Sequence, residues 1–195
     1  MPVLVVATGN PGKVTEFAAY LKDTPWDLQL KPAEIDVVET GKTFAENAAL
    51  KATTVAQATG QWAIADDSGL AVRALGGAPG LYSARYGLDD ENRIRRVLYE
   101  LKEFDDRYAE FLCAIAVARP DGSIALDVEG ACPGKIVEPQ GEGGFGYDPI
   151  FYVPEAGKTF AAMDKTEKRR LSHRVERSQR SEEHTSELQS PDHLV

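Results

Sequence analysis

The stretch LVVATGNPGKVTEF, residues 4–17, joins two patterns of different period. Residues 3–7 form an unbroken apolar run, which is typical of a buried strand. After the segment ATGNPGK, residues 7–13, apolar side chains recur from Val14 to Leu21 at i, i+3, i+4 and i+7, the spacing of one helix face. The sequence therefore predicts a strand, a tight turn and a helix in succession.

The turn between this strand and helix has the composition of an anion site. Gly9 and Gly12 permit a close approach of the backbone to a ligand, and amide groups at the start of a helix attract anions. Lys13 adds a positive charge. The spacing is not that of a Walker A loop, because Gly9 is only three residues before Gly12 and Val14 replaces the required hydroxyl. From spacing alone, phosphate binding and a plain strand-to-helix turn are equally good interpretations.

Helix and strand signals alternate along the rest of the chain. Residues 28–38 predict a second strand, with residues 35–38 its strongest part. The capping box formed by Thr43 and Glu46 begins a helix that ends at Gly60. Further patterns predict a short strand at 62–65, a helix at 90–102, and strands at 108–118 and 123–131 joined by a hairpin turn at 120–123. This order predicts an α/β fold with a mixed central sheet and flanking helices.

Composition and charge restrict the class of partner. The formal net charge of -9 argues against nucleic acid, but a nucleotide remains possible because local cations or a metal ion can reverse the field at one site. The chain has no apolar run of the roughly 18 residues that a membrane span needs, and no secretory signal pattern follows Met1. Cys113 and Cys132 lack metal-ligand spacing and are interpreted as reduced thiols. We expect a cytoplasmic protein that binds neither nucleic acid nor membrane.

Acidic residues follow the predicted strand at 62–65. Asp66 and Asp67 stand before Ser68, and successive strand residues point to opposite faces, so one carboxylate enters any given site. Such a carboxylate suits Mg²⁺, which binds through one or two carboxylates plus substrate phosphates, and it can also polarise water. Glu39 is a candidate second ligand. In isolation, the pattern favours two aspartates that cap a turn, and it favours Glu39 as a solvated loop residue.

Two later segments could bind a base. In GGFGYDP, residues 143–149, Phe145 and Tyr147 could stack on a purine, and Asp148 could accept hydrogen bonds from base N–H groups; a structural turn is about equally compatible. The basic segment EKRRLSHR, residues 167–174, is predicted at the start or along one face of a helix, where such runs are usually solvated. Its candidate binding residues are Lys168, His173 and Arg174.

Taken together, six segments stand in the order found in the inosine/xanthosine triphosphate pyrophosphatases, and the chain resembles that family over residues 3–174. The segments are ATGNPGK, FAENAALKA, ADDSGL, GGAPGLYSARY, GGFGYDPIF and EKxxxSHR. The resemblance implies two lobes around a nucleotide cleft, a homodimer and a requirement for Mg²⁺. It also implies hydrolysis of non-standard purine triphosphates (ITP, dITP and XTP) to the nucleoside monophosphate and pyrophosphate.

The resemblance also implies roles for individual residues. Asp67 would be the catalytic base and a metal ligand, and Glu39 a second metal ligand. The residues implied for the triphosphate are Thr8, Gly9, Asn10, Pro11, Gly12, Lys13 and Ser68. Those implied around the base and sugar are Phe145, Gly146, Tyr147, Asp148, Lys168, His173 and Arg174. The chemistry agrees, because a triphosphate carries about four negative charges that must be neutralised before cleavage.

The C-terminal part departs from the family pattern. After the SHR at 172–174 the family continues as Gly-Lys-Ala-Leu into an amphipathic helix, whereas this chain reads VERSQ at 175–179. Residues 180–195, RSEEHTSELQSPDHLV, are polar and aperiodic and resemble the translation of a sequencing-adapter oligonucleotide. We treat them as a non-native tail and expect a single domain over 1–179. Two alternatives stay open: a nucleotide-binding module with little turnover, and a septum-inhibitor-like nucleotide pyrophosphatase.

Overall fold

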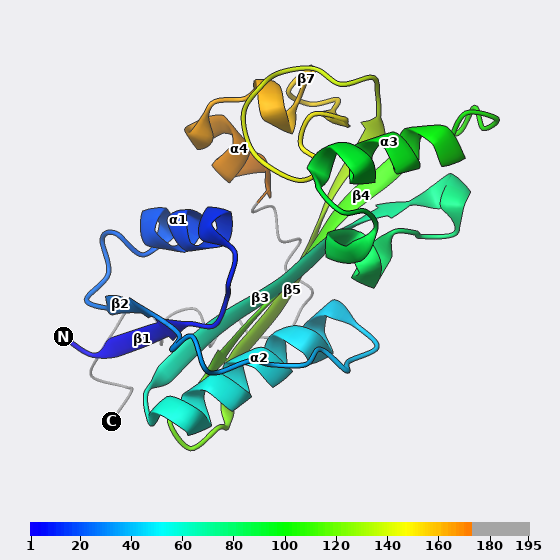
Figure 1. Cartoon of the computed structure of the whole chain (residues 1–195). Helices are drawn as coiled ribbons and strands as arrows, with labels where there is room; N and C mark the ends of the chain where they lie inside the picture. Colours follow the sequence, from blue (N-terminus) through cyan, green and yellow to red (C-terminus); the bar gives the residue numbers. More distant parts are fainter. Residues whose placement is uncertain (173–195) are drawn as a thin grey trace. The chain divides into compact units, whose positions relative to one another are not determined.

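The computed structural model describes residues 1–172, so the predicted residues His173 and Arg174 and the tail 180–195 lie outside the described part (Figure 1). The chain divides into two compact units. Unit 1 contains Met1–Asp67 and Ala114–Glu129, and unit 2 contains Ser68–Cys113 and, of the described residues, 130–172. A seven-stranded sheet has the order β2-β1-β3-β4-β5-β6-β7. The strands that continue from one unit into the other are β3 (Trp62–Val72), β4 (Tyr108–Ala118) and β5 (Ile124–Ile136).

Unit 1 is built on parallel strands. The strand β1 (Val3–Val6) pairs in parallel with β2 (Asp27–Leu30) on one side and with β3 on the other. The connections are helical: α1 (Pro11–Tyr20) follows β1, and α2 (Phe44–Thr59) precedes β3. This is the strand, turn and helix succession that the opening segment predicts.

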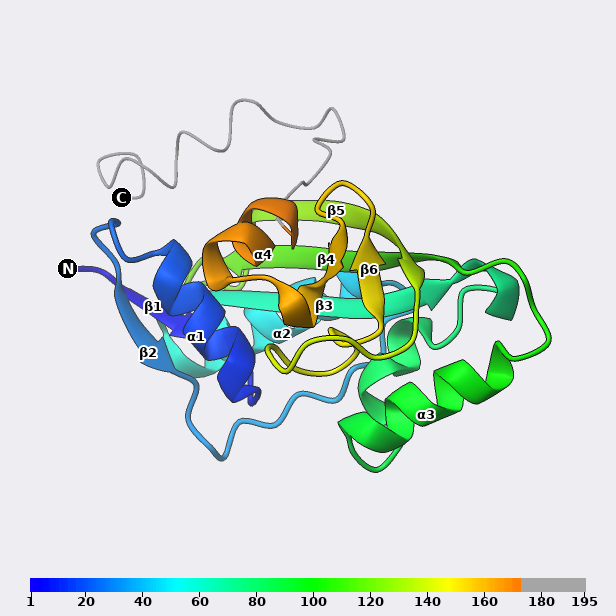
Figure 2. The same cartoon turned by 90° about the horizontal axis from the view of Figure 1, so that it is seen from above.

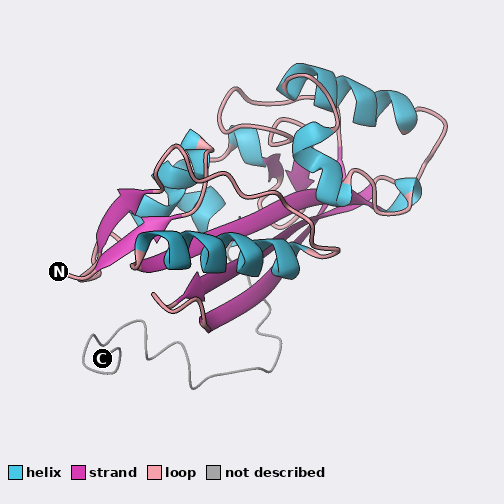
Figure 3. Cartoon of the chain, turned by 60° about the horizontal axis from the view of Figure 1, so that its bottom comes forward, coloured by secondary structure: helices cyan, strands magenta, loops and turns pink. Residues whose placement is uncertain are grey.

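The residues around β1 alternate between two hydrophobic clusters, as the period of a strand requires. Leu4 and Val6 pack in a cluster with Phe17 of α1. Val5 and Ala7 pack in a second cluster with α2, which lies along the other face of these strands (Figure 3). The buried residues of α2 in this cluster are Ala48, Ala52, Val55 and Ala56. Their short side chains let the helix backbone lie close to the sheet.

The ends of α2 follow from its local sequence. The Thr43 Oγ1 accepts a hydrogen bond from the Glu46 amide at 3.1 Å, which caps the helix as predicted. The Glu46 carboxylate accepts from the Lys42 amide at 2.6 Å, one residue before the position of the standard capping box. Gly60 ends the helix with a left-handed φ of 64°, and its amide donates to the Ala56 carbonyl at 2.8 Å.

The predicted strand at residues 28–38 is wrong for its second half, because the strand in this region is Asp27–Leu30 only. Pro32 has no N–H group and therefore interrupts the ladder soon after the strand. The apolar residues Ile35 and Val37 pack against the cluster on the α2 side instead of pairing with a neighbouring strand. Their alternation reflects burial and not strand pairing.

Unit 2 surrounds a cluster rich in aromatic rings. The rings of Phe111, Phe151 and Phe160 lie with centroids 4.9 to 5.8 Å apart. Val97 and Leu171 contribute from two helices, α3 (Asp90–Glu100) and α4 (Lys165–Ser172), which Figure 2 shows with the neighbouring strands. The remaining elements are β6 (Phe151–Val153), β7 (Lys158–Thr159) and three 3₁₀ turns, Arg73–Leu75, Gly80–Arg85 and Phe160–Ala162.

Two predicted strands are longer than their sequence patterns indicate. The strand predicted at 62–65 extends to Val72, so Asp66 and Asp67 lie inside β3 and not in a turn after it. The strand predicted at 123–131 extends to Ile136, and the short β6 and β7 gave no periodic signal. Within residues 1–172, no helix combines the length and the apolar character that crossing a membrane requires.

Candidate functional site

The turn between β1 and α1 is the segment from which the sequence predicts phosphate binding. Thr8 Oγ1 accepts a hydrogen bond from the Asn10 amide at 3.1 Å, and α1 begins at Pro11, where a missing amide is tolerated. Gly9 does not have a left-handed φ, and a Cβ added there would meet no heavy atom within 4 Å. Neither backbone strain nor packing of the described residues therefore explains this glycine. Lys13 lies in the first turn of α1.

The two aspartates of β3 face different helices. Lys13 of α1 pairs with Asp66 at 2.6 Å between Nζ and Oδ2. The other carboxylate oxygen of Asp66 is buried and has no hydrogen-bond partner among the described residues. Asp67 instead contacts α2. The alternation predicted for a strand is confirmed, and each aspartate contacts its own group of functional candidates.

Three side chains of unit 1 form what we term the carboxylate–lysine cluster: Glu39, Lys51 and Asp67. The Lys51 ammonium lies 2.8 Å from Glu39 Oε1 and 3.4 Å from Asp67 Oδ1. Asn47, one turn earlier in α2, donates from Nδ2 to Asp67 Oδ2 at 3.0 Å and accepts from the Gly41 amide at 2.8 Å. Asn47 therefore fixes one oxygen of Asp67.

Sequence reasoning missed Asn47 and Lys51 as site residues. Both belong to FAENAALKA, which contributed to the family resemblance only as a segment. Their spacing of four residues places them on one face of α2, and Asn47 is a buried polar residue on an otherwise alanine-rich face. A buried amide and a lysine on the apolar side of an amphipathic helix were the available signals.

Burial governs the electrostatics of the cluster. It raises the pKa of the Asp67 carboxyl above its usual value, while the Lys51 charge and the Asn47 hydrogen bond oppose that shift and Glu39 adds to it. A raised carboxyl pKa lies nearer to neutral pH, which improves a proton acceptor.

The carboxylates of the cluster meet part of what a metal ion needs. Across residues 1–172, no group of three or more His, Cys, Asp or Glu side chains is arranged to hold a metal. Glu39 and Asp67 nevertheless converge on one cation, the Lys51 ammonium. Mg²⁺ is usually held by one or two carboxylates together with substrate phosphates. These two carboxylates therefore fit an Mg²⁺ ion that the substrate helps to bind, and they do not fit an all-protein metal cage.

The loop at residues 143–149 holds a second set of candidates, in unit 2. Asp148 is 2% exposed, and its Oδ2 accepts from the Phe145 amide at 2.9 Å and from Lys168 Nζ at 2.7 Å. Burial raises the pKa of Asp148, and the charge of Lys168 opposes this. The Lys168 ammonium also lies 4.7 Å from the centroid of the Phe145 ring. The structure thus brings these three predicted residues together.

The two aromatic residues of this loop differ in exposure. Phe145 is 38% exposed, whereas Tyr147 is 3% exposed and donates from its hydroxyl to the Ser83 carbonyl at 2.8 Å. The Ser83 hydroxyl in turn accepts from the Leu70 amide at 2.9 Å. Tyr147 therefore anchors the loop in the core, and Phe145 is the aromatic residue of the loop with an accessible ring. The predicted residue Ser68 is half-buried in β3.

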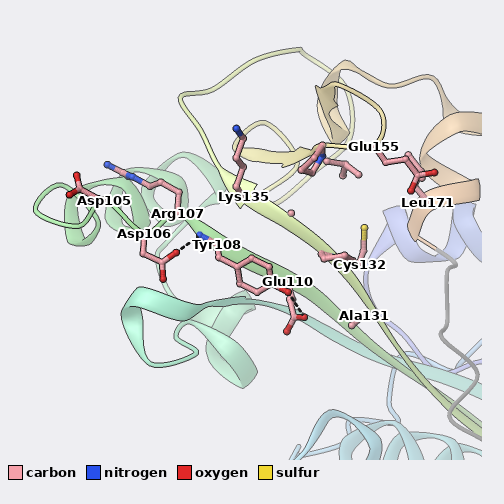
Figure 4. A pocket seen from close by; sticks show the side chains of 14 residues that line it. Asp105, Asp106, Arg107, Tyr108, Glu110, Ala131, Cys132, Lys135, Glu155 and Leu171 are labelled. Carbon is pink, nitrogen blue, oxygen red and sulfur yellow. Dashed lines mark hydrogen bonds between the residues drawn. The ribbon is translucent and has the colours of Figure 1, made fainter.

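Unit 2 also carries a groove of about 970 Å³, and none of the described residues that line it belongs to this loop (Figure 4). In its wall, the Tyr108 amide donates to Asp106 Oδ1 at 3.0 Å, and the Tyr108 hydroxyl donates to Glu110 Oε1 at 2.8 Å. Among the described residues that line the groove, none is a predicted site residue.

Comparisons with known proteins agree on one family. The model of the Ham1 family matches residues 4–180. A dITP/XTP pyrophosphatase from Synechocystis sp. is 59% identical over 175 residues, covering 89% of this chain and 90% of that protein. One from Nostoc sp. is 60% identical over 173 residues, covering 88% of each. The solved structure of a HAM1 protein from Coxiella burnetii has a TM-score of 0.82 at 41% identity and covers 89% of this chain and 93% of that one.

Proposed function

The chain belongs to the Ham1 family, and we propose that it is an Mg²⁺-dependent hydrolase of non-standard purine nucleoside triphosphates, with nucleoside monophosphate and pyrophosphate as products. Relatives of this sequence, more than half identical over most of its length, are named dITP/XTP pyrophosphatases. The resemblance and the fold class predicted from the sequence are confirmed. The observation that carries the proposal is the carboxylate–lysine cluster of Glu39, Lys51 and Asp67.

The triphosphate is held by groups of unit 1. Amide groups of the turn at residues 8–13 and the start of α1 attract phosphate oxygens, and the open space beside Gly9 allows their approach. Lys13 and Lys51, each now paired with carboxylates, supply positive charge to the same ligand. This supports binding of a polyanion by a chain whose net charge is negative.

Asp67 is the proton acceptor for the attacking water. The water oxygen forms a bond to one of the two phosphorus atoms joined by the oxygen that bridges the first and second phosphates. The bond from that phosphorus to the bridging oxygen breaks, the bridging oxygen leaves with the other product, and one water proton passes to the Asp67 carboxylate. Asn47 supports this role because it fixes one oxygen of that carboxylate. Glu39 and Asp67 hold the metal, and bound Mg²⁺ neutralises charge on the phosphate oxygens.

The purine subsite, which we define as Phe145, Asp148 and Lys168, recognises the base. The exposed Phe145 ring stacks on the purine. A 6-oxopurine presents an N1–H donor beside an oxygen acceptor, and Asp148 and Lys168 provide the matching acceptor and donor. Adenine presents the reverse pattern, which offers neither side chain a matching hydrogen-bond partner on the base, and such a mismatch can reject a ligand by several orders of magnitude. Guanine shares this edge, so its rejection depends on the 2-position.

We further propose a cytoplasmic homodimer that binds neither nucleic acid nor membrane. The dimer rests on the family resemblance, and light scattering coupled to size-exclusion chromatography would measure its mass. The alternatives, a binding module and a septum-inhibitor-like pyrophosphatase, are not favoured because the similar proteins are named as dITP/XTP pyrophosphatases.

The decisive experiment incubates the full chain with ITP, dITP, XTP, GTP or ATP, with MgCl₂ or with EDTA, and quantifies nucleoside monophosphate, pyrophosphate and phosphate. We expect equimolar IMP and pyrophosphate from ITP with Mg²⁺ only, and little product from ATP. Binding of ITP without product would support the binding module instead. Release of single phosphates would contradict the proposed bond cleavage.

A further inference from the structure

The loop at residues 143–149 has an attachment that the proposed function does not use. Two of its attachments are the buried Tyr147 hydroxyl and Asp148 carboxylate. Another is a hydrogen bond from the Gly146 amide to Asp90 Oδ2 at 2.7 Å, between residues 56 positions apart in the sequence. Asp90 is the first residue of α3, and it belongs to unit 2 with the loop.

The helix itself does not require this aspartate as a cap. Asp89 caps α3, and its carboxylate accepts from the Asn92 amide at 2.8 Å. The Asp90 carboxylate is shared between the loop and Arg93, whose Nη1 lies 2.5 Å from Oδ1. Asp90 is oriented on one side by the guanidinium and on the other by the Gly146 amide, although its side chain is 47% exposed.

The peptide that this bond fixes carries the exposed ring of the purine subsite. The Gly146 amide belongs to the peptide between Phe145 and Gly146, and Gly146 has a φ of 62°, a conformation that glycine adopts without strain. Fixing the plane of this peptide restricts the directions available to the Phe145 side chain, over which Lys168 lies. We infer that Asp90 is a positioning residue of the purine subsite, which holds Phe145 ready to stack on the base. This inference rests on the proposed function.

If Asp90 only stabilised the start of α3, its replacement would have a different effect. An acidic residue in the first turn of a helix interacts favourably with the helix dipole wherever its side chain points. Glu91 shares that property and lies next to Asp90, but it pairs with Arg95 at 2.5 Å and its side chain is 81% exposed. Glu91→Ala is therefore the matched control for Asp90→Ala.

The test measures kcat and KM for ITP, together with inhibition by inorganic tripolyphosphate, which has no base. For Asp90→Ala we expect KM to rise about tenfold, equivalent to about 1.4 kcal/mol, with kcat within about twofold and tripolyphosphate inhibition unchanged. Asp90→Asn keeps an oxygen acceptor for the Gly146 amide, so its KM should stay within about threefold of wild type. Glu91→Ala should match wild type in all three quantities.

The outcomes separate this inference from the proposed function. An unchanged KM in Asp90→Ala, or equal weakening of ITP and tripolyphosphate, overturns the positioning role while leaving the hydrolase intact. A KM increase of the same size in Glu91→Ala also overturns it, because the effect then belongs to the helix. If wild type does not turn over ITP at all, the proposed function fails and the inference falls with it.

Discussion

Replacing Gly144 with alanine should damage the protein in a way that a neighbouring glycine replacement does not. Gly144 has a φ of 74°, and a Cβ added to it would overlap Asp148 Oδ2 and lie 2.8 Å from Asp148 Cγ. Gly146 has a similar φ of 62°, but a Cβ there would meet nothing within 4 Å. Gly146→Ala is therefore a control for backbone strain without the collision.

The two variants should differ in unfolding free energy, because only Gly144→Ala disturbs the interactions of Asp148. Both introduce a left-handed alanine, which costs about 1–2 kcal/mol. Gly144→Ala also displaces a carboxylate that is almost fully buried and bonded to Lys168 and the Phe145 amide. Breaking a buried ion pair costs about 3–5 kcal/mol, because the remaining charge is left without its partner. The loss of unfolding free energy is then about 4–7 kcal/mol for Gly144→Ala.

Urea unfolding of wild type and both variants, followed by circular dichroism at pH 7, measures these losses. An unchanged slope with urea would show that the midpoint shift reports stability. The difference of about 3–5 kcal/mol between the variants corresponds to roughly 10 °C in melting temperature for a chain of this size. Gly144→Ala should also raise KM for ITP, because Asp148 belongs to the purine subsite.

Equal stability of the two variants, within about 1 kcal/mol, would contradict this account. It would mean that the Asp148 carboxylate moves without losing its partners. The carboxylate would then not be held rigidly enough by Lys168 to act as the acceptor that base recognition needs.

Three other changes have defined outcomes. Asp67→Asn should abolish ITP turnover. Burial raises the pKa of Asp67, so the stability that wild type gains from the bound proton is lost as the pH rises from 3.8 through the pKa of the folded state. In urea unfolding, the unfolding free energy of the variant should therefore equal or exceed that of wild type at pH 7 and match it at low pH. Asp66→Asn should raise KM for ITP by altering Lys13 and reduce kcat far less than Asp67→Asn, as initial rates would show. Thr43→Ala should lose about 1 kcal/mol of unfolding free energy without a change in KM, because it removes the cap of α2.

Local signals predicted the parts of the fold that depend on neighbours in the sequence. The helix cap at Thr43, the left-handed end at Gly60 and the strand–turn–helix unit at the start of the chain all match the structure. Each of these depends on hydrogen bonds within about four residues or on the period of one element. The candidates Glu39 and Asp67 came from the same kind of local pattern together with the family resemblance.

The parts of the fold and of the site that the sequence did not predict depend on contacts between distant segments. No local pattern indicates that β3 continues through Asp66 and Asp67, because the cations that pair with these adjacent carboxylates, Lys13 and Lys51, come from two different helices. The same limit applies to Phe145 and Tyr147, which look alike in sequence but differ in burial. A side chain's exposure and its partners depend on residues far along the chain, so the amino-acid order could propose these groups, and only the folded arrangement could assign them separate roles.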